Sequence, residues 1–82
     1  MHRVKYTIKS YGIAKDIVGD RTVTISTPAT SVGELRAWLT NTYPELTQLR
    51  SLLIAVNKNY AEDHIALAET DEIVLIPPVS GG

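Results

Sequence analysis

The C-terminus carries the residues of this chain that are best suited to chemistry. The sequence ends Pro77-Pro78-Val79-Ser80-Gly81-Gly82, directly after an apolar run. Two prolines favour an extended, polyproline-like segment that projects the chain end away from its domain. The final glycines lack Cβ atoms, so this end can thread a channel too narrow for side chains, and Val79 can anchor it against a partner. We therefore expect the tail to enter a partner's active site, with the Gly82 carboxylate as its working group.

The interior of the sequence offers no comparable set of reactive side chains. Cysteine is absent, which excludes disulfides, thiolate metal sites and a cysteine nucleophile. His64 follows Glu62 and Asp63 in a polar stretch, where a solvated histidine is far more common than a metal or acid–base site. Asp71 and Glu72 are adjacent, and neighbouring residues of a strand point to opposite faces, so we interpret them as turn formers. We expect no catalytic residue, metal or bound cofactor within the chain itself.

Composition and charge exclude several classes of partner. The formal net charge is −1, and no cluster of Lys or Arg stands out, which argues against nucleic acid and anionic membranes. The apolar and charged fractions are those of an ordinary folded domain. No stretch is apolar for long enough to span a bilayer, and the N-terminus lacks the apolar core of a signal peptide. A cytoplasmic location is the resulting expectation.

The N-terminal part predicts a hairpin with a short helix in its connection. Polar and apolar residues alternate over residues 3–9, the period of a half-buried strand. Residues 13–18 have helical spacing, and Gly19 is a suitable helix end. Residues 21–27 are rich in β-branched types and predict a second strand that pairs back on the first.

A longer helix follows the hairpin. Ser31 and Glu34 have the spacing of a capping box, and Pro44 ends the helix after Tyr43. We expect Trp38 to be a core residue because it shares the apolar face of this helix. That face consists of Val32, Leu35, Trp38 and Leu39.

The C-terminal part predicts three further strands. Residues 52–57 form an apolar run, expected to be a central strand buried on both faces. The loop at residues 63–69 contains an apolar pair that favours a brief strand. Residues 72–76 form the last strand, which Pro77 ends. The order strand, strand, helix, strand, short strand, strand predicts an α+β fold of the ubiquitin-like β-grasp type, although other small α+β folds share this order. We expect the domain at residues 1–76 and the tail at residues 77–82.

The C-terminal sequence resembles a known family. Glu72-Ile73-Val74-Leu75-Ile76-Pro77-Pro78-Val79-Ser80-Gly81-Gly82 is similar to the terminal signature of the molybdopterin synthase small subunit. Ala55-Val56-Asn57 resembles that family's Val-Asn at the end of the third strand, and residues 11–19 resemble its first loop helix. Two departures concern turn geometry and partner docking: Thr70 stands where the family commonly has glycine, and Ile76 where it often has an aromatic residue.

The resemblance implies a carrier of sulfur. In that family a ubiquitin-activating-like adenylyltransferase uses ATP to adenylate the terminal glycine, and a sulfur donor protein then converts it to a thiocarboxylate. Both the adenylate and the thiocarboxylate would form on the carboxyl group of Gly82 here. The large synthase subunit takes in the tail and transfers the sulfur to a pterin precursor, in an assembly of two large and two small subunits. We expect apolar residues on the exposed sheet face, together with residues 77–82, to contact that large subunit.

Three alternatives share some of these features. The thiamin-pathway sulfur carrier has the same fold and Gly-Gly end, but it is usually shorter and lacks Pro-Pro-Val. A ubiquitin-related modifier that joins lysines uses the same activation chemistry. A β-grasp interaction module with an incidental glycine end would carry no sulfur.

Overall fold

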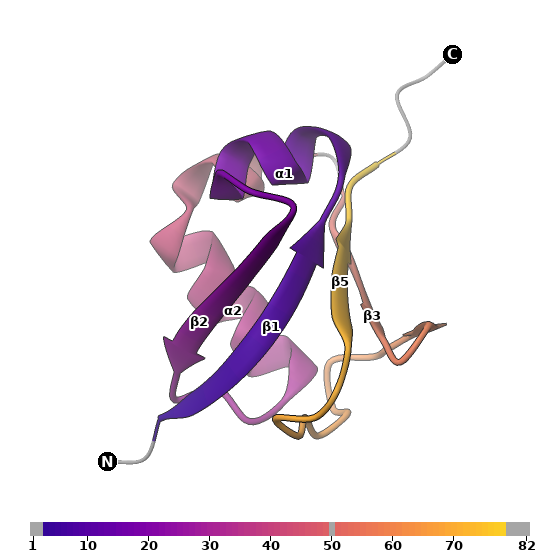
Figure 1. Cartoon of the computed structure of the whole chain (residues 1–82). Helices are drawn as coiled ribbons and strands as arrows, with labels where there is room; N and C mark the ends of the chain where they lie inside the picture. Colours follow the sequence, from indigo (N-terminus) through magenta and orange to yellow (C-terminus); the bar gives the residue numbers. More distant parts are fainter. Residues whose placement is uncertain (1–2, 50, 79–82) are drawn as a thin grey trace.

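A computed structural model describes residues 3–49 and 51–78 of the chain, which alternate between strands and helices (Figure 1). In chain order the elements are β1 (Val4–Ser10), α1 (Gly12–Val18), β2 (Thr22–Thr27), α2 (Val32–Thr42), a 3-10 helix η1 (Pro44–Gln48), β3 (Leu53–Val56), β4 (Asn59–Tyr60) and β5 (Ile73–Ile76). Within these described residues, no helix has the length and apolar character that crossing a bilayer requires.

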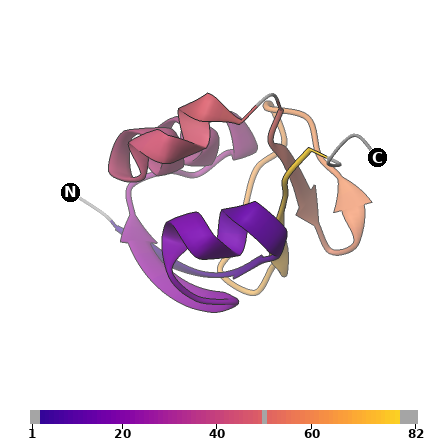
Figure 2. The ribbon, with the colours of Figure 1, turned by 90° about the horizontal axis from the view of Figure 1, so that it is seen from above.

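The strands form one mixed sheet in the order β2-β1-β5-β3-β4. β1 and β5 run parallel, and the other neighbours are antiparallel. α2 lies across one face of the sheet, whereas α1 sits at the end toward which β5 runs (Figures 1 and 2). A helix that crosses from an N-terminal hairpin to the far side of a mixed sheet is the β-grasp arrangement, so the predicted fold is confirmed.

The core lies between α2 and one face of the sheet. Alternation along the strands turns Tyr6 and Ile8 of β1 inward, together with Ile73 and Leu75 of β5. The Tyr6 hydroxyl donates to the Ala29 carbonyl at 2.8 Å, and burial raises the pKa of this phenol. The fully buried residues of α2 are Val32, Leu35 and Leu39.

The N-terminus of α2 is capped nearly as predicted. The Ser31 hydroxyl accepts a hydrogen bond from the Glu34 backbone N–H at 3.3 Å. The Glu34 carboxylate reaches back one residue further than expected, because it accepts from the Thr30 N–H at 2.8 Å and from the Thr30 hydroxyl at 2.9 Å. These bonds lower the pKa of Glu34.

The loop before β5 is fastened to this same helix end. The Val32 and Gly33 N–H groups donate to the carbonyls of Ile65 and Asp63, both at 2.9 Å. A Cβ atom added at Gly33 would lie 3.0 Å from the Asp63 Cβ, so the glycine permits this close approach. Backbone groups that a helix terminus leaves unpaired therefore hold the loop in place.

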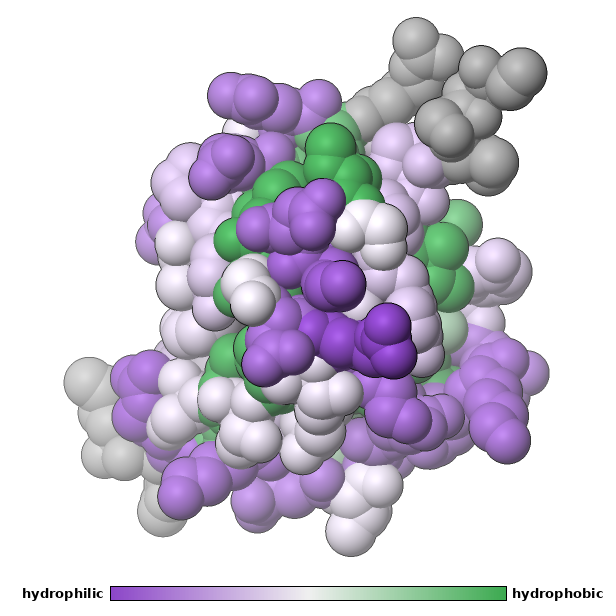
Figure 3. Space-filling view, turned by 45° about the horizontal axis from the view of Figure 1, so that its top comes forward, coloured by the Kyte–Doolittle hydropathy of each residue, from purple (hydrophilic) through white to green (hydrophobic). Residues whose placement is uncertain are grey.

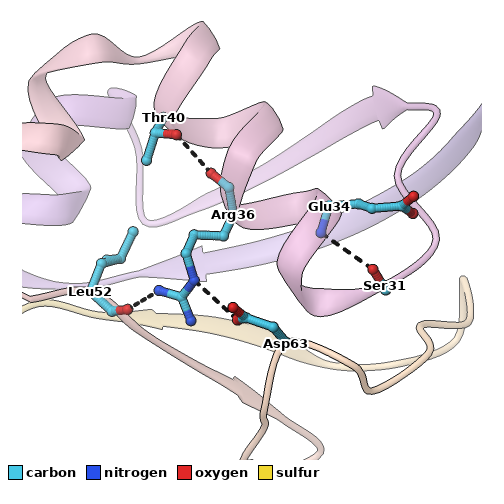
Figure 4. A network of polar contacts seen from close by, with 6 residues as sticks. All are labelled: Ser31, Glu34, Arg36, Thr40, Leu52 and Asp63. Carbon is cyan, nitrogen blue, oxygen red and sulfur yellow. Dashed lines mark hydrogen bonds and ion pairs between the residues drawn. The ribbon is translucent and has the colours of Figure 1, made fainter.

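Arg36 connects α2 to two other segments (Figure 4). Its guanidinium donates to the Leu52 carbonyl just before β3, and its Nε lies 3.3 Å from the Asp63 carboxylate. The Thr40 hydroxyl donates back to the Arg36 carbonyl at 3.0 Å. This flank of α2 thus faces the β3 side of the molecule.

Trp38 is not the core residue that its spacing predicted. Its side chain is half-buried and packs against the edge of the core, whereas Leu35 and Leu39 are fully buried. The reason is geometric: Trp38 lies at the margin of the apolar face, roughly a quarter turn from its centre at 100° per residue.

The expected burial of β3 on both faces is wrong. Ile54 and Ala55 are buried, but Leu53 is 46% exposed. β5 occupies the middle of the sheet, and α2 covers only one face. The apolar character of this strand therefore does not come from burial on both sides.

The expected brief strand at residues 63–69 is also wrong. The short strand is β4, which pairs with β3 through a tight turn at Asn57 and Lys58. These two residues have φ values of 52° and 73°, as a two-residue hairpin turn requires. The later loop contributes only one isolated bridge, between Ala66 and Ser31.

Candidate functional site at the start of the tail and on the open sheet face

The tail begins where β5 passes the junction of β1 and α1. Pro77 and Pro78 are both partly buried. Gly12 has a φ of +56°, and a Cβ atom added to it would lie 3.6 Å from the Pro77 ring. Pro77 thus packs against the first turn of α1, and this contact helps set the direction in which the chain leaves the sheet. Val79, Ser80, Gly81 and Gly82 lie outside the described residues.

The face of the sheet that α2 leaves open is apolar over β5, β3 and β4. Leu53 pairs with Ile76, and Ala55 pairs with both Val74 and Tyr60, so all five side chains share the outer face. Leu53 is 46% exposed and Tyr60 is 71% exposed. We call this surface the apolar half of the open face; it consists of Leu53, Ala55, Tyr60, Val74 and Ile76.

The rest of the open face is polar. The outward residues of β1 and β2 are Lys5, Thr7, Lys9, Thr22, Thr24 and Ser26. Lys9 and Glu72 form an ion pair of 2.9 Å beside Val74, at the boundary with the apolar half. Their hydrogen bond raises the pKa of Lys9 and lowers that of Glu72, so both groups are charged at neutral pH.

The apolar half is continuous with the start of the tail. Ile76 belongs to both, since it is the last residue of β5 and directly precedes Pro77. Tyr11 and Ile13, on the α1 side of this junction, are 48% and 51% exposed. Figure 3 brings this end of the molecule forward and shows hydrophobic surface there among hydrophilic side chains. A partner that holds the tail would therefore also meet exposed apolar surface.

The polar side chains of the interior sequence either stabilise turns or are exposed to solvent. The His64 Nδ1 lies 3.8 Å from the Glu62 carboxylate, and both side chains are largely exposed. Asp71 accepts hydrogen bonds from the Ala68 N–H and the Asn57 amide, as a turn former does. Among residues 3–49 and 51–78, no three His, Asp or Glu side chains gather where they could hold a metal ion.

Tyr60 and Leu53 were not singled out from the sequence. Asn57-Lys58 lacks the glycine that marks most two-residue hairpin turns, so the pairing of Tyr60 with Ala55 was not evident. The alternation of β3 against β5 would have placed Leu53 outward, but the unbroken apolar run concealed it.

Comparisons with known proteins identify relatives of this chain by sequence and by fold. The model of the ThiS family matches residues 8–82. The molybdopterin synthase sulfur carrier subunit of Caenorhabditis briggsae is 36% identical over 83 residues, covering 96% of this chain and 99% of the relative. Among solved structures, SAMP1 from Haloferax volcanii is 26% identical with a TM-score of 0.76, covering 95% and 99% of the two chains.

A solved complex is also similar. It contains subunits 1 and 2 of the molybdopterin-converting factor from Helicobacter pylori; the matching chain is 26% identical with a TM-score of 0.65, and the match covers 96% of this chain and all of that one. The sequence match and the structure match thus each cover nearly the whole length of the chain. The chain therefore belongs to the ThiS family, together with the molybdopterin synthase sulfur carrier subunits.

Proposed function

We propose that this protein is the sulfur carrier subunit of a molybdopterin synthase and delivers sulfur as a thiocarboxylate on Gly82. The observation that carries the proposal is the continuity of the tail with the apolar half through Ile76. One partner can hold the domain by this surface while the tail reaches its active site. The similarity to molybdopterin synthase sulfur carrier subunits supports the same function.

The chemistry requires two partner proteins before sulfur can be delivered. A carboxylate is a poor electrophile until one oxygen becomes part of a leaving group. A cytoplasmic adenylyltransferase would transfer AMP from ATP to the Gly82 carboxylate and release pyrophosphate. Sulfide-level sulfur released by a sulfur donor protein would then attack the acyl carbon and displace AMP, which leaves the thiocarboxylate. This chain has no cysteine, so its terminus is the place where sulfur can be carried.

The large synthase subunit would then receive the tail. Its contact with the apolar half would withdraw Leu53 and Tyr60 from water, which favours association. The tail would occupy the channel to the pterin through residues 77–82, and the thiocarboxylate sulfur would attack the precursor. Water would then hydrolyse the resulting thioester, which leaves the sulfur on the pterin and a carboxylate on Gly82. Two sulfur atoms are needed for each dithiolene, in keeping with an assembly of two large and two small subunits.

Intact-protein mass measurement tests the modification. The chain is incubated with the adenylyltransferase, ATP and the sulfur donor, and then weighed. We expect the mass to rise by the difference between sulfur and oxygen, with the change confined to the C-terminal peptide. A control with one residue appended after Gly82 should fold normally and gain nothing. Sulfur on the control, or elsewhere on the wild type, would refute the proposal.

Protein modification is a second candidate, favoured by the likeness to SAMP1, a small archaeal modifier protein. In this function Gly82 would also be activated by adenylation, but the product would be an amide between Gly82 and a lysine of a target protein. In the same host, purification of the tagged chain under denaturing conditions distinguishes the two. Covalent conjugates would indicate a modifier, whereas the free chain with a thiocarboxylate would indicate a carrier.

A further inference from the structure

β2 is an edge strand, and within residues 3–49 and 51–78 no strand pairs with its outer side. The Ser10 N–H donates to the Arg21 carbonyl at 2.7 Å, so this opposed pair is hydrogen-bonded. Because hydrogen-bonded and non-hydrogen-bonded pairs alternate along an antiparallel ladder, the next such pairs fall at Val23 and Ile25. Thr22 and Thr24 therefore turn their N–H and C=O groups away from β1.

An independent contact supports this orientation of the backbone. The same alternation turns the Ser26 carbonyl outward, and the Arg3 guanidinium donates to it at 2.6 Å and to the Ser26 hydroxyl at 3.2 Å. Arg3 thus protects one end of the edge, as charged side chains do on many edge strands. Among the described residues, none bonds to the outward groups of Thr22 and Thr24. β2 contains no proline or charged residue that would repel an incoming strand.

A hollow of about 380 Å³ lies between the end of β2 and α2. Pro28 and Ala29, which follow β2, form one wall. The other wall is the flank of α2 that carries Trp38, away from the flank where Arg36 contacts the β3 side. The α2 residues that line the hollow are Glu34, Ala37, Trp38 and Asn41.

We propose that the open edge of β2 and this hollow bind an extended peptide segment of a partner protein. The segment adds to the sheet as a strand by pairing with the Thr22 and Thr24 backbone, and one of its apolar side chains fills the hollow beside Trp38. Strand addition of this kind takes affinity from main-chain hydrogen bonds and specificity from pockets for alternate side chains.

Charge selects among the possible segments. Arg21 directly precedes β2 and Arg3 lies against Ser26 near the end of β2, so cations flank the open stretch. An apolar segment that keeps acidic groups out of the hollow, where Glu34 lies, and places them beside Arg3 or Arg21 complements these charges. A second copy of this chain would bring its own Arg3 and Arg21 to the same edge, which makes it the poorer occupant.

This site is separate from the surface used by the proposed function. β2 and β4 are the opposite edges of the sheet, and the apolar half lies beside β4. The peptide segment and a partner that holds the tail can therefore bind together. The site would serve to recruit a further protein to the carrier.

Titration of the full chain, labelled with ¹⁵N, tests the proposal. The probe is a capped peptide with the sequence Val-Ile-Val-Ile-Asp-Asp-Asp. We expect shifts at Thr22, Thr24 and Ala37 and at the Trp38 indole N–H, slower amide exchange at Thr22 and Thr24, and a Kd of about 100 µM. No shifts at about 1 mM peptide, or shifts at Leu53 and Val74 instead, would overturn it.

Substitutions make the test specific. The Thr24 N–H points away from β1, so Thr24→Pro removes an outward donor while the ladder to β1 stays intact. It should weaken binding about 10-fold or more, whereas the matched Thr24→Val should bind as wild type. Ala37→Glu, on the exposed side of α2, should weaken binding similarly by placing a charge in the hollow. Unchanged binding by Thr24→Pro and Ala37→Glu would contradict the proposal, as would a dimer of the free chain that already protects the Thr22 and Thr24 amides.

Discussion

Leu53→Asp should separate docking from folding. Leu53 lies in the apolar half and is 46% exposed. Full burial of a leucine contributes about 1.5–3 kcal/mol, so a partner that completes its burial gains about 1 kcal/mol from this side chain. Aspartate would forfeit that gain and place an unpaired charge in the interface, at a cost of several kcal/mol. Together these effects should weaken the complex with the large subunit about 100-fold or more.

The matched control is Thr7→Asp on the same sheet face. Thr7 points outward from β1, within the polar part, and should lie outside the contact. Calorimetric titration of each variant with the large subunit gives the Kd, and urea unfolding of the free chains checks that neither loses more than about 1 kcal/mol. Equal binding by Leu53→Asp and wild type, or equal weakening by both variants, would refute the assignment of the apolar half as the docking surface.

Four further substitutions test the fold. Arg36→Met should lower the free energy of unfolding by about 1–3 kcal/mol because it leaves the Leu52 carbonyl without its donor. Asp63→Asn should cost less than about 1 kcal/mol, since the Asp63 side chain that pairs with Arg36 is largely exposed. The pKa of Glu34 is lowered from its ordinary value of 4.5, so the ionised carboxylate adds to the free energy of unfolding above that pH, and this contribution is lost as the pH falls through the pKa of the folded state. Glu34→Gln should therefore make the free energy of unfolding fall less steeply at acid pH. Lys58→Gly should stabilise the hairpin by up to about 1 kcal/mol, because Lys58 has a φ of 73°.

Urea unfolding as a function of pH measures the effects of all four substitutions, and the expected results can be contradicted as follows. Equal costs for Arg36→Met and Asp63→Asn would mean that the ion pair, not the carbonyl contact, carries the energy. If Glu34→Gln leaves the pH dependence of unfolding at acid pH unchanged, the Glu34 carboxylate does not contribute to acid unfolding. A destabilised Lys58→Gly would show that the entropy of the glycine outweighs the relieved strain.

Local patterns in the sequence predicted most of the fold. Alternation identified β1 and β2, and the Ser31 and Glu34 spacing located the start of α2, because these features depend on neighbours within a few residues. The proline pair located the end of β5 for the same reason.

Features that depend on distant neighbours were not predicted. Trp38 has helical spacing with the core, but only the position of β2 decides that its flank borders a hollow. The hydrogen bond from the Gly33 N–H to the Asp63 carbonyl joins residues thirty positions apart, and no local sequence pattern predicts it. The apolar run of β3 has the same sequence pattern whether the strand is buried on both faces or exposes one face to a partner protein.

The candidate site was predicted in part. The start of the tail at Pro77 follows from the sequence, and the family resemblance implied an exposed apolar sheet face, whereas Tyr60 depends on a hairpin whose turn lacks glycine. The role of Gly82 remains a prediction that chemistry must test.

Sulfur transfer in a single turnover tests the central claim most directly. The chain is prepared with a thiocarboxylate on Gly82, mixed with the large subunit and the pterin precursor, and the sulfur content of the pterin is measured by mass spectrometry. We expect one sulfur transferred for each Gly82 carboxylate regenerated, and none from the unmodified chain. Pterin that gains sulfur from the unmodified chain, or a thiocarboxylate that persists while product forms, would contradict the account.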